Sequence, residues 1–140
     1  MATFVKRPAV GSVGQYQMSA KPFATGAFTV PATGDAPMEI VFPYVTSWFS
    51  IANGDDSVPI RVGFSANGTT GSNVGANENN FYVVANGDFQ QFKLRVRSIF
   101  LLSATTAQSN VQIMAGLTGI VNDLFGPDDK PNYSGSVGVG

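Results

Sequence analysis

The sequence predicts an all-β protein, built as a single antiparallel β-sandwich of about seven or eight strands. Short apolar runs recur about every 8 to 14 residues along the chain. Gly, Pro, Asn, Ser and Thr separate these runs and interrupt almost every window of helical length. A length of 140 residues suffices for one domain with its own core. Because no helical segments alternate with the strands, we do not expect a parallel α/β sheet.

The composition excludes several kinds of chemistry. The chain has no Cys and no His, which rules out Cys nucleophiles, Ser-His-Asp triads and zinc sites built on these residues. We therefore expect a non-enzymatic protein without a cofactor or a metal ion. Only 12% of the residues are charged and the net charge is −1, so the chain is not a polycation designed for nucleic acid. A sparsely charged surface suits a protein that packs against neighbours.

The chain is expected to divide into three segments, namely an irregular N-terminal arm over residues 1–25, a sandwich domain over 26–121 and a Gly/Pro-rich C-terminal tail over 122–140. Pro and Gly break the arm repeatedly, yet it carries Phe4, Tyr16 and Phe23. A free tail would not need these aromatic residues. We expect the arm to lie either on its own domain or on a neighbouring subunit.

The first strands are predicted at residues 27–30 and within 38–53. Pro43 cannot donate to a sheet ladder, so the second run is either two strands or one bent edge strand. Alternation in its second half places four residues on one face, namely Val45, Ser47, Phe49 and Ile51. Asn53-Gly54 then predicts a hairpin turn, because Asn-Gly readily adopts the left-handed backbone of a tight turn.

Further strands follow the same pattern. The run "VPIRVGFSA" (58–66) places Ile60, Val62 and Phe64 on one face, and the polar stretch 67–80 is expected to be an exposed contact loop. The strand "FYVVA" (81–85) ends at a second turn signal, "NGD". The longest strand is expected over 89–104, with a bend near Ser98. The last strand, "NVQIMAGLTGI" (110–120), alternates so that four residues face inward, namely Val111, Ile113, Ala115 and Leu117.

Three of the eight cations occupy every second position of the longest predicted strand, at Lys93, Arg95 and Arg97. The residues between them are apolar and are expected to face inward, namely Phe92, Leu94 and Val96. The row of cations is then a solvated strand face, a contact with acidic residues of a partner subunit, or a nucleic-acid contact. Three charges without a second basic cluster make a small footprint for nucleic acid, so we do not expect that partner.

Other polar residues have ordinary structural explanations. Two Asp pairs, 55–56 and 128–129, stand beside Gly or Pro in turns, where Asp caps backbone N–H groups. Neither pair has the alternating oxygens and bidentate Glu of a calcium loop. Glu39, Glu78 and Asp88 show no spacing that indicates a glycosidase. No apolar stretch approaches the length of a membrane span, and the N-terminus lacks the apolar run of a secretory signal.

The aromatic residues allow two interpretations. At strand spacing, aromatic side chains are most often part of the core. Exposed at the surface of a β-sandwich, Trp48, Tyr44 or Tyr82 could instead form a flat platform for a sugar. This alternative predicts a carbohydrate-binding or receptor-binding module.

Over roughly residues 40 to 120 the sequence resembles small virion proteins, the capsid-associated β-sandwich proteins of double-stranded DNA viruses and phages. The resemblance lies in the segments "IRVGFS", "NNF", "KLRVRSIF" and "AGLTGI". It implies a single, jelly-roll-like sandwich and a role in the capsid, as a decoration, cement, vertex or minor shell component. It names no active site.

We therefore expect a structural protein of a virus particle, located in the virion, that stabilises the shell through contacts with other capsid subunits and with copies of itself. The residues expected to make such contacts are Lys93, Arg95, Arg97, Phe4, Tyr16 and Phe23. We expect no small-molecule substrate and no membrane partner.

Overall fold

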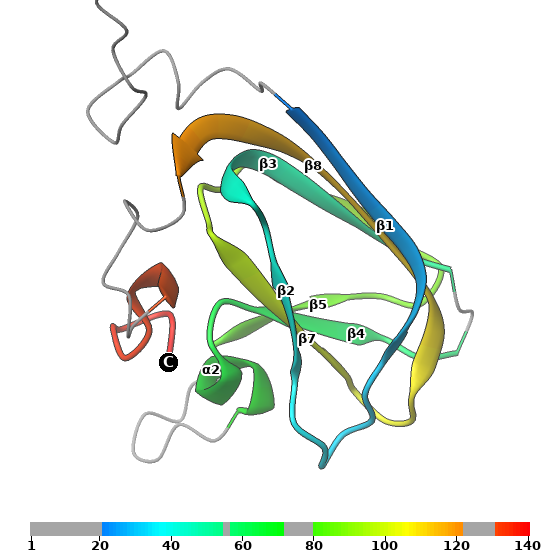
Figure 1. Ribbon diagram of the computed structural model, residues 1–140. Helices are drawn as coiled ribbons and strands as arrows, with labels where there is room; N and C mark the ends of the chain where they lie inside the picture. Colours follow the sequence, from blue (N-terminus) through cyan, green and yellow to red (C-terminus); the bar gives the residue numbers. More distant parts are fainter. Residues whose placement is uncertain (1–20, 55–56, 72–79, 122–130) are drawn as a thin grey trace, which may run out of the picture.

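The computed structural model describes residues 21–54, 57–71, 80–121 and 131–140. Two antiparallel sheets pack face to face and enclose the core, so the predicted all-β sandwich is confirmed (Figure 1). Each sheet has four strands, which gives eight strands in the described part of the chain.

The first sheet has the strand order β1-β8-β3-β6. These strands span Lys21–Val30 (β1), Gln108–Val121 (β8), Tyr44–Asn53 (β3) and Phe89–Phe92 (β6). The second sheet has the order β2-β7-β4-β5. Its strands span Met38–Val41 (β2), Ser98–Ser103 (β7), Ile60–Gly63 (β4) and Phe81–Val84 (β5).

Consecutive strands rarely pair with each other. Only β4 and β5 are neighbours both along the chain and within a sheet, and every other connection between consecutive strands crosses from one sheet to the other. This arrangement of eight strands is a jelly roll. Its pairing is therefore dominated by contacts between segments that are remote in the sequence, such as β1 with β8 and β2 with β7.

The core lies between the two sheets and is formed by alternating residues, as period-two patterning requires. The predicted inward residues of β3, β4 and β8 are confirmed in it, namely Phe49, Ile51, Ile60, Val62, Val111, Ile113, Ala115 and Leu117. β7 is different, because all six of its residues are buried. A short α-helix, α2 (Ala66–Thr70), contacts β4 and β7.

The N-terminal strand is longer than predicted. β1 begins at Lys21, so residues 21–25 belong to the sheet and not to an irregular arm. Phe23, expected to contact a neighbouring subunit, packs against the core of its own domain, and its ring meets Phe42 edge to face at a centroid distance of 5.1 Å. Phe4 and Tyr16 lie outside the described residues.

The hairpin predicted at Asn53-Gly54 is wrong, because β3 and β4 belong to different sheets. The Gly54 N–H donates to the Asn110 carbonyl at 2.8 Å, which ties this crossing to the start of β8. The turn after β5 is confirmed: Gly87 has φ 72° and the Asp88 N–H donates to the Ala85 carbonyl. It also links two sheets. Asn-Gly predicts a reversal of the chain, but not which sheet the chain enters next.

The predicted exposed loop 67–80 begins as a helix. The Ser65 hydroxyl caps α2 by accepting a hydrogen bond from the Gly68 N–H at 2.9 Å, and Gly71 ends it with φ 75°. Thr69 is fully buried and its hydroxyl donates to the Ser65 carbonyl. The first part of the loop is therefore packed on the domain, and residues 72–79 lie outside the described part.

The described end of the tail, residues 131–140, is attached to the domain. Asn132 in the 3₁₀ turn η2 (Pro131–Tyr133) is buried, and its amide oxygen accepts from the Arg97 N–H at 2.9 Å. Its amide nitrogen donates to the carbonyls of Ser98 at 2.6 Å and Phe64 at 3.3 Å. The predicted tail without a core pattern thus ends in a segment held by the Asn132 side chain and by the Ser65 hydroxyl, which donates to the Val139 carbonyl at 2.8 Å.

Deleting residues 1–25 should destabilise the domain far more than deleting residues 1–20. The longer deletion removes half of β1 and the contact between Phe23 and Phe42. Loss of a large aromatic side chain alone costs about 3 kcal/mol. Urea unfolding of both truncated proteins measures the difference. Equal stabilities would show that residues 21–25 contribute little to the sheet.

Replacing Asn132 with Gly should lower the free energy of unfolding by about 2 kcal/mol, because one buried and two partly buried backbone groups lose their partner. Gly tolerates the φ of 54° at this position, so the loss reports on the side chain and not on backbone strain. The matched control is Ser136→Gly in the exposed part of the same tail. If both variants unfold at the same urea concentration, Asn132 does not anchor the tail.

Candidate functional site

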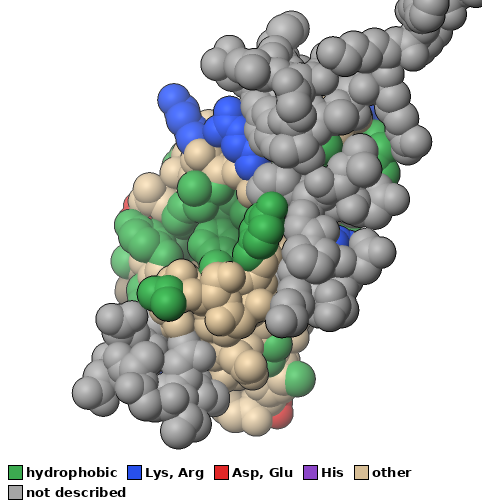
Figure 2. Space-filling view, turned by 90° about the vertical axis from the view of Figure 1, so that its left-hand side faces the viewer, with side chains coloured by type: hydrophobic (Ala, Val, Ile, Leu, Met, Phe, Trp, Pro, Cys, Tyr) green, Lys and Arg blue, Asp and Glu red, His purple; other side chains and the backbone are tan. Residues whose placement is uncertain are grey.

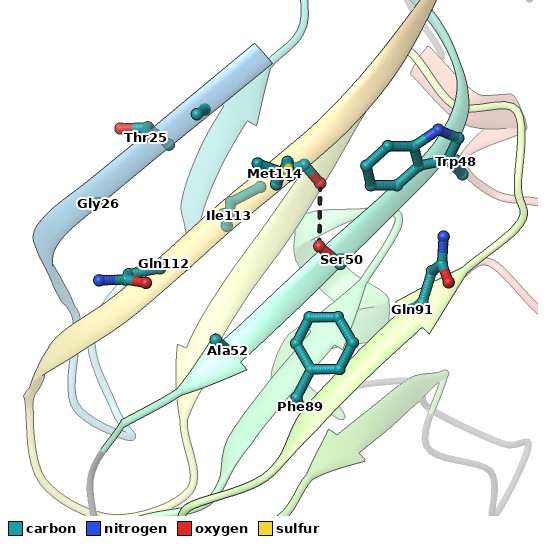
Figure 3. Close-up of a pocket in the computed structure, with 11 residues that line it drawn as sticks. Thr25, Gly26, Trp48, Ser50, Ala52, Phe89, Gln91, Gln112, Ile113 and Met114 are labelled. Atoms are coloured by element: carbon teal, nitrogen blue, oxygen red, sulfur yellow. Dashed lines mark hydrogen bonds between the residues drawn. The ribbon is translucent and has the colours of Figure 1, made fainter. Parts of the chain in front are cut away.

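The outer face of the β1-β8-β3-β6 sheet is concave and holds an open hollow of about 670 Å³ (Figure 3). Its position follows from the register of the strands. Ser50 of β3 lies between Met114 of β8 and Gln91 of β6. Because side chains alternate along a strand, the inward Phe49 and Ile51 direct Trp48, Ser50 and Ala52 to this outer face.

The floor of the hollow is made of small residues. Ala52 and Gly26 lie on either side of Gln112, and Ala24 lies on the other side of Met114 from Ser50. Ser50 is buried and its hydroxyl donates to the Met114 carbonyl at 3.4 Å (Figure 3). These small side chains leave the backbone of the sheet accessible between larger neighbours.

The larger residues stand around this floor. Trp48 lies at one end and Phe89 at the other, and the side chain of Gln91 extends toward the indole (Figure 3). Phe89 and Met114 are strongly exposed, at 60% and 54%. Trp48 is half-buried, whereas the amides of Gln91 and Gln112 are exposed. The hollow therefore combines aromatic and aliphatic surface with two side-chain amides.

Among the described residues that line the hollow, none carries a charged side chain. Without an ionisable group these residues offer no general acid or base, and neither a proton transfer nor an ion pair with a ligand can start from their side chains. What they can provide is apolar contact together with amide hydrogen bonds.

The predicted aromatic platform forms only in part. Trp48 is in the hollow, but Tyr82 lies on β5 of the other sheet and packs edge to face on Phe92 at 5.4 Å. Phe92 in turn stacks on the core residue Phe49 at 4.9 Å. Tyr44 is half-buried and lies 4.4 Å from the Lys21 ammonium, measured to the ring centroid. Trp48, Tyr82 and Tyr44 therefore do not share one face.

Sequence reasoning missed four residues of the hollow, namely Phe89, Gln91, Gln112 and Met114. Alternation on the last strand contained a signal for two of them, because Gln112 and Met114 fall between the inward residues. The sheet order was the missing information. It brings the outer residues of β6 and β8 to opposite sides of β3.

The expected strand of alternating cations is wrong. β6 ends at Phe92 and β7 begins at Ser98, and the residues between them cross from one sheet to the other. Thr46 holds this crossing, since its hydroxyl donates to the Leu94 carbonyl at 2.7 Å and accepts from the Val96 N–H at 3.1 Å. Leu94 is 41% exposed instead of inward, while Val96 is buried as predicted.

The three cations consequently have different environments. Lys93 is exposed, whereas Arg95 and Arg97 are half-buried. Arg95 helps to line a smaller hollow of about 200 Å³ between the crossing and the anchored tail, together with Leu94 and Tyr133. Figure 2 shows one face of the molecule on which hydrophobic side chains gather below Lys and Arg side chains.

The carboxylates do not form a site in the described part of the chain. Asp88 accepts a hydrogen bond from the Phe89 N–H at 2.8 Å, which is the backbone-capping role of a turn residue. Glu39 is exposed on β2. No group of three Asp or Glu residues suited to a metal ion occurs among the residues described. Glu78 and both Asp pairs lie outside them.

No known family model, curated protein or solved structure matches this chain. No helix in the described part has the length and hydrophobicity of a membrane span.

Replacing Val96 with Ala should cost about 2 kcal/mol, while Leu94→Ala should cost less than about 1 kcal/mol. The reason is that Val96 is 6% exposed and belongs to the core, whereas Leu94 is 41% exposed. Thermal or urea unfolding of the two variants measures the order. The reverse order would support the continuous strand that the sequence predicted.

Proposed function

We propose that this chain is a non-enzymatic structural protein of a virus particle, acting as a decoration, cement, vertex or minor capsid component. The observation that carries the proposal is the strand order β1-β8-β3-β6 facing β2-β7-β4-β5. Jelly rolls of this kind serve as viral capsid domains and as lectin domains. This support is an analogy of fold, and the surface of the molecule adds to it.

The surface features favour a role in assembly. The outer face of the first sheet exposes Phe89 and Met114 in a hollow whose described lining residues carry no charge. Apolar surface that is depleted of charge is typical of the centre of protein interfaces. A rigid sandwich that presents such surfaces can contact several neighbours at once, and many modest contacts add up through multivalency.

The proposed mechanism is geometric. The packed core keeps the two sheets rigid, and the crossings and terminal segments reach neighbouring subunits. The exposed Lys93 at one crossing suits an acidic or carbonyl-rich partner surface. Closed symmetry would then repeat each contact around the particle.

Particles purified on a density gradient from the natural source of the chain should contain it at many copies and in constant stoichiometry. Quantitative mass spectrometry of the gradient fractions measures this. A chain found only in the unassembled fractions, and never with particles, would contradict the proposal.

Charge reversal at Lys93 should weaken the incorporation of the chain into particles. An exposed ion pair contributes up to about 1 kcal/mol, so Lys93→Glu should lower affinity by up to about fivefold at each contact. High salt should reduce wild-type occupancy toward that of the variant, because salt screens exposed pairs. Lys21→Glu on β1 is the matched control for net charge. Equal occupancy of both variants at every salt concentration would show that Lys93 faces only solvent.

A further inference from the structure

The hollow on the β1-β8-β3-β6 sheet has a feature that subunit packing does not require. Two exposed amides, Gln91 and Gln112, stand at its border, and a half-buried indole, Trp48, lies at one end (Figure 3). The volume of about 670 Å³ falls in the range of small-ligand sites, about 300 to 1,000 Å³. Such sites combine mostly apolar walls with a few polar groups that orient the ligand.

We propose that this hollow binds a neutral carbohydrate, with a sugar ring against the Trp48 indole and sugar hydroxyls hydrogen-bonded to the amides of Gln91 and Gln112. Each amide carries both donors and an acceptor, which matches the hydroxyl group, itself a donor and an acceptor. One face of a pyranose ring presents mainly C–H groups, and an indole offers a rigid apolar surface for it.

The charge of the site defines the class of sugar. The described lining residues include no cation, so a uronic or sialic acid would lose the solvation of its carboxylate without gaining an ion pair from them. Neutral sugar units carry no such penalty. The site therefore selects against acidic sugars by the absence of a compensating cation.

The floor of the hollow explains how a ring can fit. Ser50 and Ala52 of β3 are small, so a ring can approach the sheet between Trp48 and Phe89. Ala24 and Gly26 of β1 are also small and keep the floor low on the other side of β8. A Cβ added at Gly26 would lie 3.3 Å from the Cγ of Gln112, closer than ordinary van der Waals contact. Glycine at this position thus leaves Gln112 free to adopt its orientation along the border.

The chain supplies its own probe, because Trp48 is its single tryptophan. The full-length protein is titrated with neutral hexasaccharides, namely cellohexaose, maltohexaose, mannohexaose and N-acetylchitohexaose, and with hexagalacturonic acid as the acidic comparison. At least one neutral hexasaccharide should shift the Trp48 emission saturably, with a Kd below about 1 mM. The acidic one should bind at least tenfold more weakly.

Variants locate the site, with binding then followed by calorimetry. Trp48→Ala should weaken binding at least tenfold, and Gln91→Ala about fivefold. The matched control is Gln90→Ala. Gln90 precedes Gln91 on β6, so its side chain points to the opposite face of the sheet. Tyr82→Ala, which removes an exposed aromatic ring from the other sheet, should leave affinity unchanged. Melting temperatures confirm that each variant is folded.

Two outcomes would overturn the carbohydrate site, namely no response to any neutral hexasaccharide at 10 mM, or binding that survives Trp48→Ala. If sugars fail and Trp48→Ala instead abolishes self-association in analytical ultracentrifugation, the hollow is an interface between copies of the chain. That result would leave the proposed structural role intact. Conversely, sugar binding by a protein that is absent from particles would overturn the structural role and retain the site.

Discussion

β8 lies between β1 and β3, and its register against these two strands determines both the core and the outer hollow. With Ile113 and Ala115 facing inward, Gln112 and Met114 must face outward. A slip of one residue would expose the first set and bury the second. The 14 residues of β8 make this register firm, because several buried side chains would have to move together.

The sheet crossings impose a second requirement, since a chain that changes sheets leaves backbone groups without ladder partners. Buried polar side chains satisfy them. Asn53 donates to the Val58 carbonyl at 2.7 Å and accepts from the amide of Gln108, which joins the end of β3 to the start of β8. The Thr46 hydroxyl satisfies backbone groups of the crossing after β6, and the Asn132 amide satisfies those at the start of β7. These three sites account for the burial of Thr46, Asn53, Gln108 and Asn132 inside an apolar sandwich.

The two faces of the first sheet are physically coupled. Packing of its inner face against the second sheet fixes the backbone, and the outer residues are thereby held at defined spacings. The backbone that carries Trp48, Ser50 and Ala52 cannot shift without disturbing Phe49 and Ile51. A pre-organised surface loses little conformational entropy on binding, which favours both subunit contacts and a small ligand. Few residues of the chain are charged, and none of the described residues that line this surface would repel a partner or ligand by its charge.

The sequence by itself determined the all-β class, the absence of His and Cys chemistry, and the inward residues of β3, β4 and β8, because alternation and composition are local properties. Only the tertiary structure decided which strands pair, where the longest predicted run breaks, and that Asn132 anchors the tail. Asn-Gly at 53–54 reverses the chain equally well in a hairpin and in a crossing between sheets. The hollow likewise needs β1, β8, β3 and β6 side by side, and their order results from burial shared between distant segments, which no local pattern records.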